Sequence, residues 1–281
     1  NLRFHAEERN NDTKFAKELA SYGDYYVNEA FSNCHRQHAS MVGIPKYIPG
    51  CVGMHVYDEI THLNLHNCKK PIYAIVGGVK LETRVPLLER LAKITKKILI
   101  GGAMVFTFYR AMGFSVGKSL VNVAEISVAA RLLKKYGKKL VLPSDILVAD
   151  SLKGNAKTKV VGCGEIDGKW MGVDNGPESI KEYRGLLKDA KTILWNGPIG
   201  VFEVEKFSCG TKEIGKCLAR SKAKTIIGGG DTSTAMHQYG LTSRMNHVST
   251  AGGASMTLLE GKDLAAINAL EKSFIKFKKK L

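Results

Sequence analysis

Short apolar runs alternate with amphipathic helical patterns along this chain from Pro71 onward. The predicted strands are 72–76, 98–100, 140–142, 146–149, 192–195, 225–227 and 247–249. The predicted helices are 82–94, 104–112, 123–136, 178–188, 205–218, 232–239 and 255–259. Strands that are regularly separated by helices indicate a parallel sheet with helices on both faces. The sequence therefore predicts an α/β fold in which ligands bind at the carboxyl ends of the strands.

Glycines follow five of these predicted strands, at 77–78, 101–102, 197, 228–230 and 252–253. Glycine lets a backbone approach a ligand without Cβ interference. After the 225–227 strand, Asp231 and Thr232 open a helical segment, whose free N–H groups would suit an anion while Asp231 holds a divalent cation. A simple turn with Asp231 as N-cap explains that segment equally well. Glycine at five strand ends favours one shared ligand site.

Composition limits the possible partners without selecting one. A net charge of +16 suits polyanions in general, including nucleic acid, acidic membranes and phosphorylated metabolites. The basic residues are spread along the chain, with a tight run at 278–280, and no ribonucleoprotein or zinc-finger motif accompanies them. We therefore expect no nucleic-acid partner. We also expect no membrane partner, because no transmembrane or signal segment is evident. The 6 cysteines form no Cys-x-x-Cys pair and are expected to be free intracellular thiols.

Two common nucleotide motifs are rejected. The segment 113–119 resembles a P-loop, but it is one residue short and follows a helical pattern. The pair Gly162 and Gly164 is followed by Asp167 where a dinucleotide-binding motif needs its third glycine. Neither segment is expected to bind a nucleotide.

Longer motifs resemble those of the phosphoglycerate kinase family, in the family's order. They are 77–80, 170–179, 195–203, 228–232 and 247–255, with substrate-side motifs at 1–5, 26–31 and 35–40. The resemblance covers essentially the whole chain. It implies reversible phosphoryl transfer between 1,3-bisphosphoglycerate and ADP, giving 3-phosphoglycerate and ATP in glycolysis.

The resemblance also implies a division of the chain. Family members have two α/β domains joined by a helix and closed by a hinge. Residues 1–50 would be the remnant of the triose-binding domain, 51–68 an interdomain helix and connector, 69–263 a Rossmann-like three-layer nucleotide-binding domain, and 264–281 a return segment with a basic tail. The family's opening strands have no counterpart before Asn1, and the chain lacks an initial Met, so we expect a fragment or processed product.

Nucleotide-side roles follow from the resemblance. The implied nucleotide-binding residues are Gly77, Gly78, Lys80, Gly101, Gly102, Asn196, Pro198, Glu203, Gly229, Gly230, Asp231 and Thr232. Asp231 would be the metal ligand for the Mg²⁺ of Mg-ADP or Mg-ATP, and Glu203 would accept the ribose hydroxyls. Lys80, Arg84, Gly252 and Gly253 are the expected catalytic residues, because phosphoryl transfer depends on positioning and positive charge.

Triose-side roles fall on Arg3, Arg36 and His35, which would contact 3-phosphoglycerate or 1,3-bisphosphoglycerate. A surface salt bridge is the alternative for each arginine. His35 and His38 form a His-x-x-His pattern, which the resemblance assigns to a substrate loop in preference to a metal site.

Several residues depart from the family pattern. Arg84 stands where a second lysine is usual, and Val79 replaces alanine. Ala103, Ala251 and Ser32 replace glycines. These changes leave nucleotide preference open.

The alternative to an active enzyme is a truncated, nucleotide-binding relative with weak or no catalysis. We expect the 281 residues to bind nucleotide but to turn over poorly. A basic nucleic-acid-binding module is a third reading that rests on net charge alone. A monomer in the cytoplasm is expected. The ending Lys279-Lys280-Leu281 weakly resembles a peroxisomal or glycosomal signal and keeps a glycosome or other organelle as the alternative.

Overall fold

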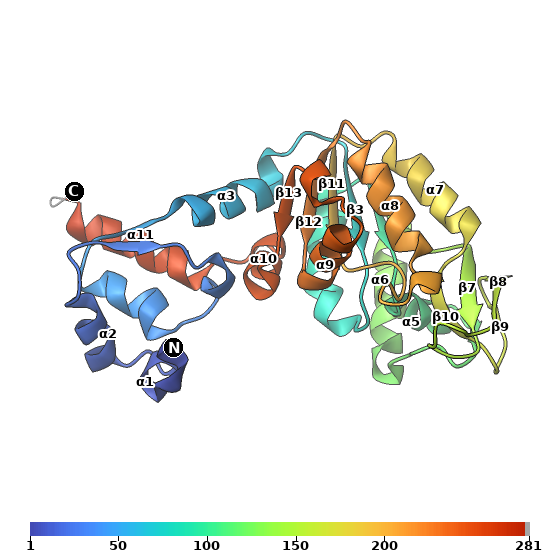
Figure 1. Ribbon diagram of the computed structural model, residues 1–281, viewed down its shortest axis with the longest axis horizontal. Coiled ribbons are helices and arrows are strands. Elements are labelled where there is room, and N and C mark those ends of the chain that lie inside the picture. Colours follow the sequence, from blue (N-terminus) through green and yellow to red (C-terminus); the bar gives the residue numbers. More distant parts are fainter. Residues whose placement is uncertain (279–281) are drawn as a thin grey trace. The chain divides into compact units, whose positions relative to one another are not determined.

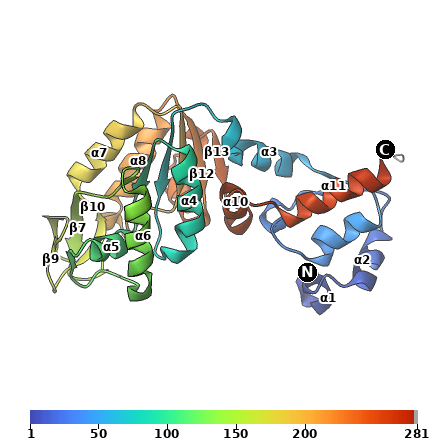
Figure 2. The same ribbon diagram turned by 180° about the vertical axis from the view of Figure 1, so that it is seen from behind.

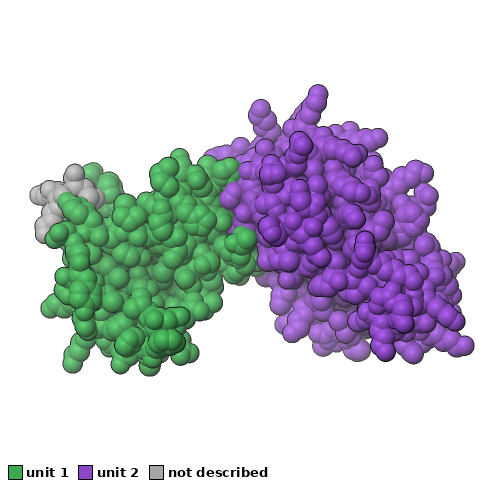
Figure 3. All heavy atoms as spheres, in the orientation of Figure 1, with its two compact units in different colours: residues 1–66, 250–281 green, residues 67–249 purple. Residues whose placement is uncertain are grey.

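The computed structural model describes residues 1–278, which form two compact units (Figure 3). Unit 1 contains Asn1–His66 together with the chain from Thr250 onward, and unit 2 is Asn67–Ser249. The ending Lys279-Lys280-Leu281, noted above as a weak targeting signal, lies outside the described residues.

A six-stranded parallel sheet forms the centre of unit 2, in the order β13-β12-β11-β3-β4-β6 (Figure 1). Its strands are β3 Ile72–Val76, β4 Lys97–Ile100, β6 Leu140–Val141, β11 Thr192–Asn196, β12 Lys224–Gly228 and β13 His247–Ser249. Every residue of the central strands β3 and β11 is buried. Strands covered on both faces carry continuous apolar runs, which is why the sequence revealed them. The predicted parallel sheet is confirmed.

Helices cover both faces of this sheet. On one face lie α7 Pro177–Leu187, α8 Cys209–Ala219 and α9 Gly230–Gln238 (Figure 1), and on the other lie α4 Val85–Ile94 and α6 Ile126–Tyr136, with α5 Met104–Ala111 packed on α6 (Figure 2). Strand order runs one way from β3 through β4 to β6 and the other way from β11 through β12 to β13. The order therefore reverses between β3 and β11, which is where open α/β sheets bind ligands.

Three of the predicted helices begin as a tight 3-10 turn. These turns are η6 Glu82–Arg84 before α4, η7 Val123–Glu125 before α6 and η8 Glu205–Phe207 before α8. Such turns are common at helix ends, where N–H groups lack intrahelical partners. Two further turns, η5 Leu65–Asn67 and η9 Thr242–Arg244, lie in connections.

The predicted strand 146–149 does not belong to the parallel sheet. It forms β7 Asp145–Ala149, the middle strand of an antiparallel sheet with β10 Met171–Asn175 and β8 Thr158–Gly162. Neither partner was predicted, because β8 is partly exposed and β10 ends in polar residues, so neither carries an apolar run. A short parallel pair, β5 Ser115–Val116 with β9 Glu165–Ile166, follows α5 and uses the rejected P-loop segment as a strand.

Unit 1 combines short elements from both ends of the chain. They are η1 Leu2–Phe4, α1 Ala6–Arg9, α2 Thr13–Ala20, β1 Tyr26–Asn28, η2 Phe31–Asn33, η3 Ala39–Gly43, η4 Ile44–Lys46, β2 Gly50–Val52, α3 Met54–Leu63, α10 Gly252–Leu259 and α11 Ala265–Phe277. Strands β1 and β2 pair in parallel. Helix α11 packs on β2, η3 and η4, and its Ser273 hydroxyl donates to the carbonyl of Ile48 at 3.2 Å.

Helix α3 begins later than the predicted start at residue 51. Residues Gly50–Val52 pair with β1 instead, and the helix begins at Met54. The Glu29 carboxylate accepts hydrogen bonds from the backbone N–H groups of His55 (2.9 Å) and Val56 (3.3 Å). A distant carboxylate thus satisfies the first turn, a start signal that local sequence does not contain.

Among residues 1–278, no helix combines the length and apolar character needed to cross a bilayer.

Candidate functional site

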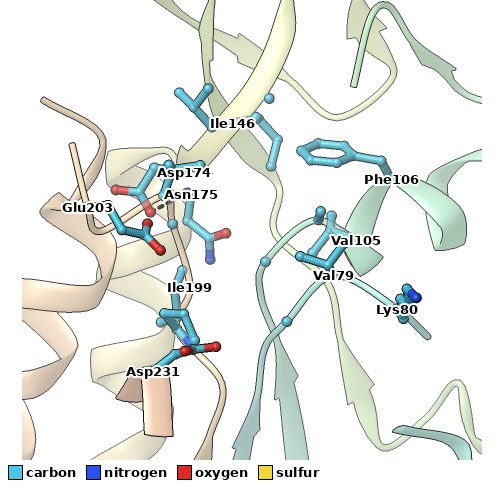
Figure 4. Close-up of a pocket in the computed structure, with 18 of the residues that line it drawn as sticks. Val79, Lys80, Val105, Phe106, Ile146, Asp174, Asn175, Ile199, Glu203 and Asp231 are labelled. Atoms are coloured by element: carbon cyan, nitrogen blue, oxygen red, sulfur yellow. Dashed lines mark hydrogen bonds between the residues drawn. The ribbon is translucent and has the colours of Figure 1, made fainter. Parts of the chain in front are cut away.

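A cavity of about 460 Å³ lies at the carboxyl ends of β3 and β11, the point of strand-order reversal. Its size is in the usual range for small-molecule sites. In Figure 4, Val79, Lys80, Val105 and Phe106 form one side, and Asp174, Asn175, Ile199, Glu203 and Asp231 form the other. The cavity is therefore a cleft built from loops that follow different strands.

The two ends of this cleft differ in polarity. Phe106 and Ile146 lie at one end, whereas Asp231 and Lys80 lie at the other on opposite sides (Figure 4). Glu203, which is exposed, lies between the ends on the side of Asp174. An apolar end suits a flat base, and a charged end suits phosphates with a divalent cation. This polarity has the order of base, ribose and phosphates in a nucleotide.

The predicted nucleotide-binding residues divide into two groups. Those that line the cavity are Gly78, Lys80, Gly102, Pro198, Glu203 and Asp231, together with Arg84. Those outside its lining are Gly77, Gly101, Asn196 and Gly229 at the strand ends, and Gly230 and Thr232 in the first turn of α9. Gly252 and Gly253 lie in unit 1 with Arg3, His35 and Arg36.

Loop packing explains some of the strand-end glycines. A Cβ on Gly77 would collide with the carbonyl oxygen of Pro198, and Gly197 has a positive φ of 93° and packs on the backbone of Gly77. Only glycine permits such backbone-to-backbone contact. These glycines therefore hold the β3 and β11 loops together, a role that their spacing in the sequence did not distinguish from ligand contact.

The start of α9 is a different case. Gly229 has a φ of 95°, the helix begins at Gly230, and a Cβ on Gly230 would meet no atom within 4 Å. Asp231 is exposed in the first turn, where backbone N–H groups have no intrahelical partner. This open helix start suits an anion.

Thr232 is 1% exposed and does not line the cavity. Its hydroxyl accepts a hydrogen bond from the backbone N–H of Gly197 at 2.8 Å. The side chain therefore links the start of α9 to the loop after β11.

Arg84, which is half-buried, and Asn196, which is buried, form a polar contact at the charged part of the site. The Arg84 guanidinium donates to Oδ1 of Asn196 at 2.5 Å, and a Cβ on Gly78 would lie 3.3 Å from the guanidinium. The Nδ2 of Asn196 is buried and has no hydrogen-bond partner among the described residues. Buried amide donors normally have an acceptor. Asn196 does not line the cavity, but a Cβ on Gly229 would lie 3.3 Å from this Nδ2, so the unpaired donor is close to the start of α9. An anionic ligand there would suit it.

The charged end of the cleft, at Asp231, could hold Mg²⁺ when a bound nucleotide supplies the other ligands. Within residues 1–278, no group of three or more His, Cys, Asp or Glu side chains could hold a metal by itself. Mg²⁺ is commonly held by one or two carboxylates plus substrate phosphates and water. Asp231 supplies such a carboxylate beside the open start of α9.

Asp174 lines the cavity but was given no role from the sequence, although it lies within the 170–179 motif. Its carboxylate accepts hydrogen bonds from the backbone N–H groups of Gly210 (2.7 Å) and Asn175 (2.9 Å). Burial raises the pKa of Asp174 to about 7, while those two bonds oppose the rise. The carboxylate also fills the space that a Cβ on Gly200 or Gly210 would need. Asp174 therefore holds the Gly200 loop against the start of α8.

The apolar residues Phe106 and Ile146 were also missed. Ile146 lies in β7, whose antiparallel sheet was not predicted, and Phe106 lies on α5 among core residues of similar type. No local signal distinguishes a cavity wall from a core residue.

The turn that carries Lys80 is fixed from a distance. The backbone N–H of Leu81 donates to Oε2 of Glu125 at 3.0 Å, and Glu125 is buried. Lys80 itself is exposed and lines the cavity, so this bond fixes the backbone next to a cation of the site.

In unit 1, His35 lies close to α10, and Arg3 is bonded to a neighbour of the His35 loop. Arg3 donates to Oδ1 of Asn33 at 2.6 Å, and a Cβ on Gly253 would lie 2.8 Å from Nε2 of His35. Burial lowers the pKa of His35, and the charges of Arg36, His38 and Arg3 lower it further. The Nδ1 of His35 is buried without a hydrogen-bond partner among the described residues. The two arginines, Arg3 and Arg36, suit a phosphate or carboxylate.

A doubly covered parallel sheet with a polar-to-apolar cleft at its reversal point is typical of α/β proteins that bind small-molecule ligands. The family described as phosphoglycerate kinase matches residues 1–262. The chain is 46% identical over 280 residues to the phosphoglycerate kinase of Synechococcus sp. and 45% identical over 280 residues to the cytosolic phosphoglycerate kinase of Nicotiana tabacum. Both alignments cover 96% of this chain and 70% of the relative. The chain belongs to the phosphoglycerate kinase family.

Solved structures of phosphoglycerate kinases have the same fold as this chain. Phosphoglycerate kinase from Coxiella burnetii has a TM-score of 0.92 at 40% identity, covering 97% of this chain and 72% of that one. The enzyme from Pyrococcus horikoshii has a TM-score of 0.86 at 30% identity, covering 99% and 73%. The family and fold predicted from the motifs are thereby confirmed. The reaction of this family is reversible phosphoryl transfer between 1,3-bisphosphoglycerate and ADP in glycolysis.

Proposed function

We propose that unit 2 binds Mg-ADP or Mg-ATP in the cleft at the ends of β3 and β11, with the base at Phe106 and the phosphates at the start of α9. The observation that carries this proposal is the buried, unpartnered Nδ2 of Asn196 beside Arg84. A buried donor without an acceptor is costly, and a phosphate oxygen relieves that cost.

The roles of the charged side chains follow from their places. Lys80 and Arg84 neutralise phosphate oxygens, Asp231 binds the Mg²⁺ of the nucleotide, and Glu203 accepts hydrogen bonds from the ribose hydroxyls. When bound, Mg²⁺ neutralises charge on the phosphate oxygens. The protein then contributes position and positive charge, and no protein nucleophile is required.

For the triose, we propose that Arg3, Arg36 and His35 bind the phosphate or carboxylate of 3-phosphoglycerate or 1,3-bisphosphoglycerate. Arginine forks suit both groups. The N–H groups at Gly252 and Gly253, in the first turn of α10, face the phosphoryl group that is transferred.

Calorimetry with ADP, with and without Mg²⁺, tests the nucleotide site. We expect Asp231→Asn to weaken Mg-ADP binding at least about tenfold and to abolish the effect of Mg²⁺, because it removes the charged ligand. Asp189→Asn changes an exposed carboxylate outside the cleft and is the matched control. An unchanged Mg²⁺ dependence in Asp231→Asn would reject the metal role.

A nucleotide-binding relative with weak catalysis remains the second candidate, because the chain covers 70% of the length of its relatives. A coupled assay for ATP-dependent use of 3-phosphoglycerate by this polypeptide separates the two candidates. Turnover supports the kinase, and Mg-ADP binding without turnover supports the weaker relative.

We also propose a cytoplasmic monomer. Relatives from Nicotiana tabacum and Arabidopsis thaliana are described as cytosolic. Localisation of a tagged chain tests this against a glycosome or another organelle, and light scattering tests the monomer.

A further inference from the structure

A second cavity in unit 2, of about 430 Å³, lies between the carboxyl-terminal ends of α7 and α8. The two helices lie side by side on one face of the sheet (Figure 1). Lys191 and Ile193, at the amino end of β11, contribute to its lining, whereas the nucleotide cleft lies at the carboxyl end of that strand. The cavity therefore lies at the opposite ends of the strands from the proposed nucleotide site.

Positive charge dominates this cavity. The cations in its lining are Arg184, Lys188, Lys191, Lys216, Arg220 and Lys222. Its carboxylate is Glu213, which lies 2.8 Å from Lys216 and 3.5 Å from Arg184. Lys216 and Arg184 lower the pKa of Glu213, so it remains charged and offsets at most one of the cations.

The other four cations lie outside the ion pairs of residues 1–278. No described residue forms an ion pair with Lys188, Lys191, Arg220 or Lys222. Like charges within one concave space repel one another and raise the local positive potential. Such a potential concentrates anions.

Helix dipoles explain part of this cluster. Arg184 and Lys216 lie in the last turns of α7 and α8, and Lys188 and Arg220 are their C-caps, where cations are favourable. Lys191 and Lys222 lie beyond the helix ends, in the connections to β11 and β12, so the dipoles do not account for them.

We propose that this cavity, the α7–α8 basic pocket, binds a small molecule that carries several phosphate groups. Its volume matches a small-molecule site, and its arginines suit phosphate geometry. Leu187, Ile193 and Ala223 form an apolar part of the lining that suits a sugar or another organic group bearing the phosphates. A single phosphate would leave most of the cations unpaired.

Cys217 provides a local test, because it lines the pocket and is half-buried. We expect inorganic tripolyphosphate to slow the alkylation of Cys217 by iodoacetamide at least about fivefold, since a bound anion covers the thiol and disfavours thiolate. Cys51, exposed in unit 1, is the internal control. Peptide mass spectrometry measures both rates. Equal slowing of both cysteines, or slowing of neither, would overturn the proposal.

Charge removal gives a second test, by calorimetry with tripolyphosphate at physiological salt and saturating ADP. Lys191→Gln with Lys222→Gln should weaken binding at least about tenfold. The control, Lys134→Gln with Lys138→Gln, removes the same charge beside the carboxyl-terminal end of α6 and should leave binding unchanged. Equal weakening in both variants would show binding to net charge alone and reject the pocket. If duplex RNA or an acidic peptide bound the pocket more tightly than tripolyphosphate and displaced it, the proposal of a small-molecule ligand would be rejected.

Discussion

At the scale of single residues, the site depends on polar groups that the protein has buried. Asp174 is 4% exposed and lines the nucleotide cleft. Its carboxylate accepts two backbone hydrogen bonds. Asn196 is 1% exposed and donates nothing from Nδ2 to the described residues. Both side chains cost stability that is recovered only through specific partners.

The pH dependence of stability should reveal Asp174. Its folded pKa is about 7 and an unfolded aspartate has a pKa of about 3.9, so between these values the folded state holds a proton that the unfolded state has lost. The free energy of unfolding should therefore fall as pH rises from about 4 to about 7, by at most about 4 kcal/mol, and then stay level.

Asp174→Asn should remove this fall in the free energy of unfolding. Urea unfolding at pH 5 and pH 8 measures the change between the two pH values in the variant and in the unchanged protein. Asp189→Asn, at an exposed position, controls for the loss of a carboxylate. An unaltered pH slope in Asp174→Asn would contradict the assignment.

Arg84 should stabilise unit 2 as well as bind nucleotide. Arg84→Lys loses the bond to Asn196 Oδ1 and leaves a buried acceptor unsatisfied, at a cost of about 1–3 kcal/mol. Chemical denaturation measures the loss, and Arg131→Lys on the exposed surface of α6 should cost no more than about 0.5 kcal/mol. Equal stability of the two variants would show that the contact contributes nothing.

At the scale of elements, glycine has two different roles in the turns that connect strands to helices. The turns after β3 and β11 need glycine because their backbones touch each other. The turn after β12 keeps open space above Gly230, beside the unpaired N–H groups of α9. The first job is structural and the second leaves room for an anion.

Gly230→Ala should therefore separate binding from folding. Its Cβ meets no atom, so stability should be kept within about 1 kcal/mol, while Mg-ADP binding should weaken at least about tenfold because the methyl group occupies the phosphate path. Gly185→Ala on α7 is a helical control with equally open space. Wild-type affinity in Gly230→Ala would place the phosphates elsewhere.

At the scale of the whole molecule, each unit contains side chains that can report its own unfolding. Both tryptophans, Trp170 and Trp195, lie in unit 2, and the Trp195 ring N–H donates to the carbonyl of Gly197 at 2.7 Å. Cys34 is buried in unit 1, where burial raises its pKa to about 11 and keeps the thiol unreactive. Unfolding of the two units can thus be followed separately.

Mg-ADP should stabilise unit 2 more than unit 1, because the nucleotide cleft is built from unit 2 alone. At a ligand concentration of about 100 times Kd, the unfolding free energy reported by tryptophan fluorescence should rise by about 2.7 kcal/mol. The urea dependence of Cys34 labelling should move less. Equal shifts would show that the units unfold as one.

The sequence predicted the parallel strands well, because β3 and β11 are buried on both faces and require unbroken apolar runs. It misplaced 146–149 because the same run suits an antiparallel sheet when its partners, β8 and β10, carry no pattern of their own. It predicted most of the charged cleft residues from motifs and missed Asp174, Phe106 and Ile146, whose roles depend on neighbours distant in sequence.

The sequence by itself determined the family, the doubly covered sheet and the residue types at the strand ends, since these depend on local pattern and ordered motifs. Tertiary structure alone decided which glycines touch backbone and which face open space, which carboxylate is buried, and that α7 and α8 end in one basic pocket. The physical reason is that packing, desolvation and charge repulsion depend on distances between segments, and sequence order does not contain those distances.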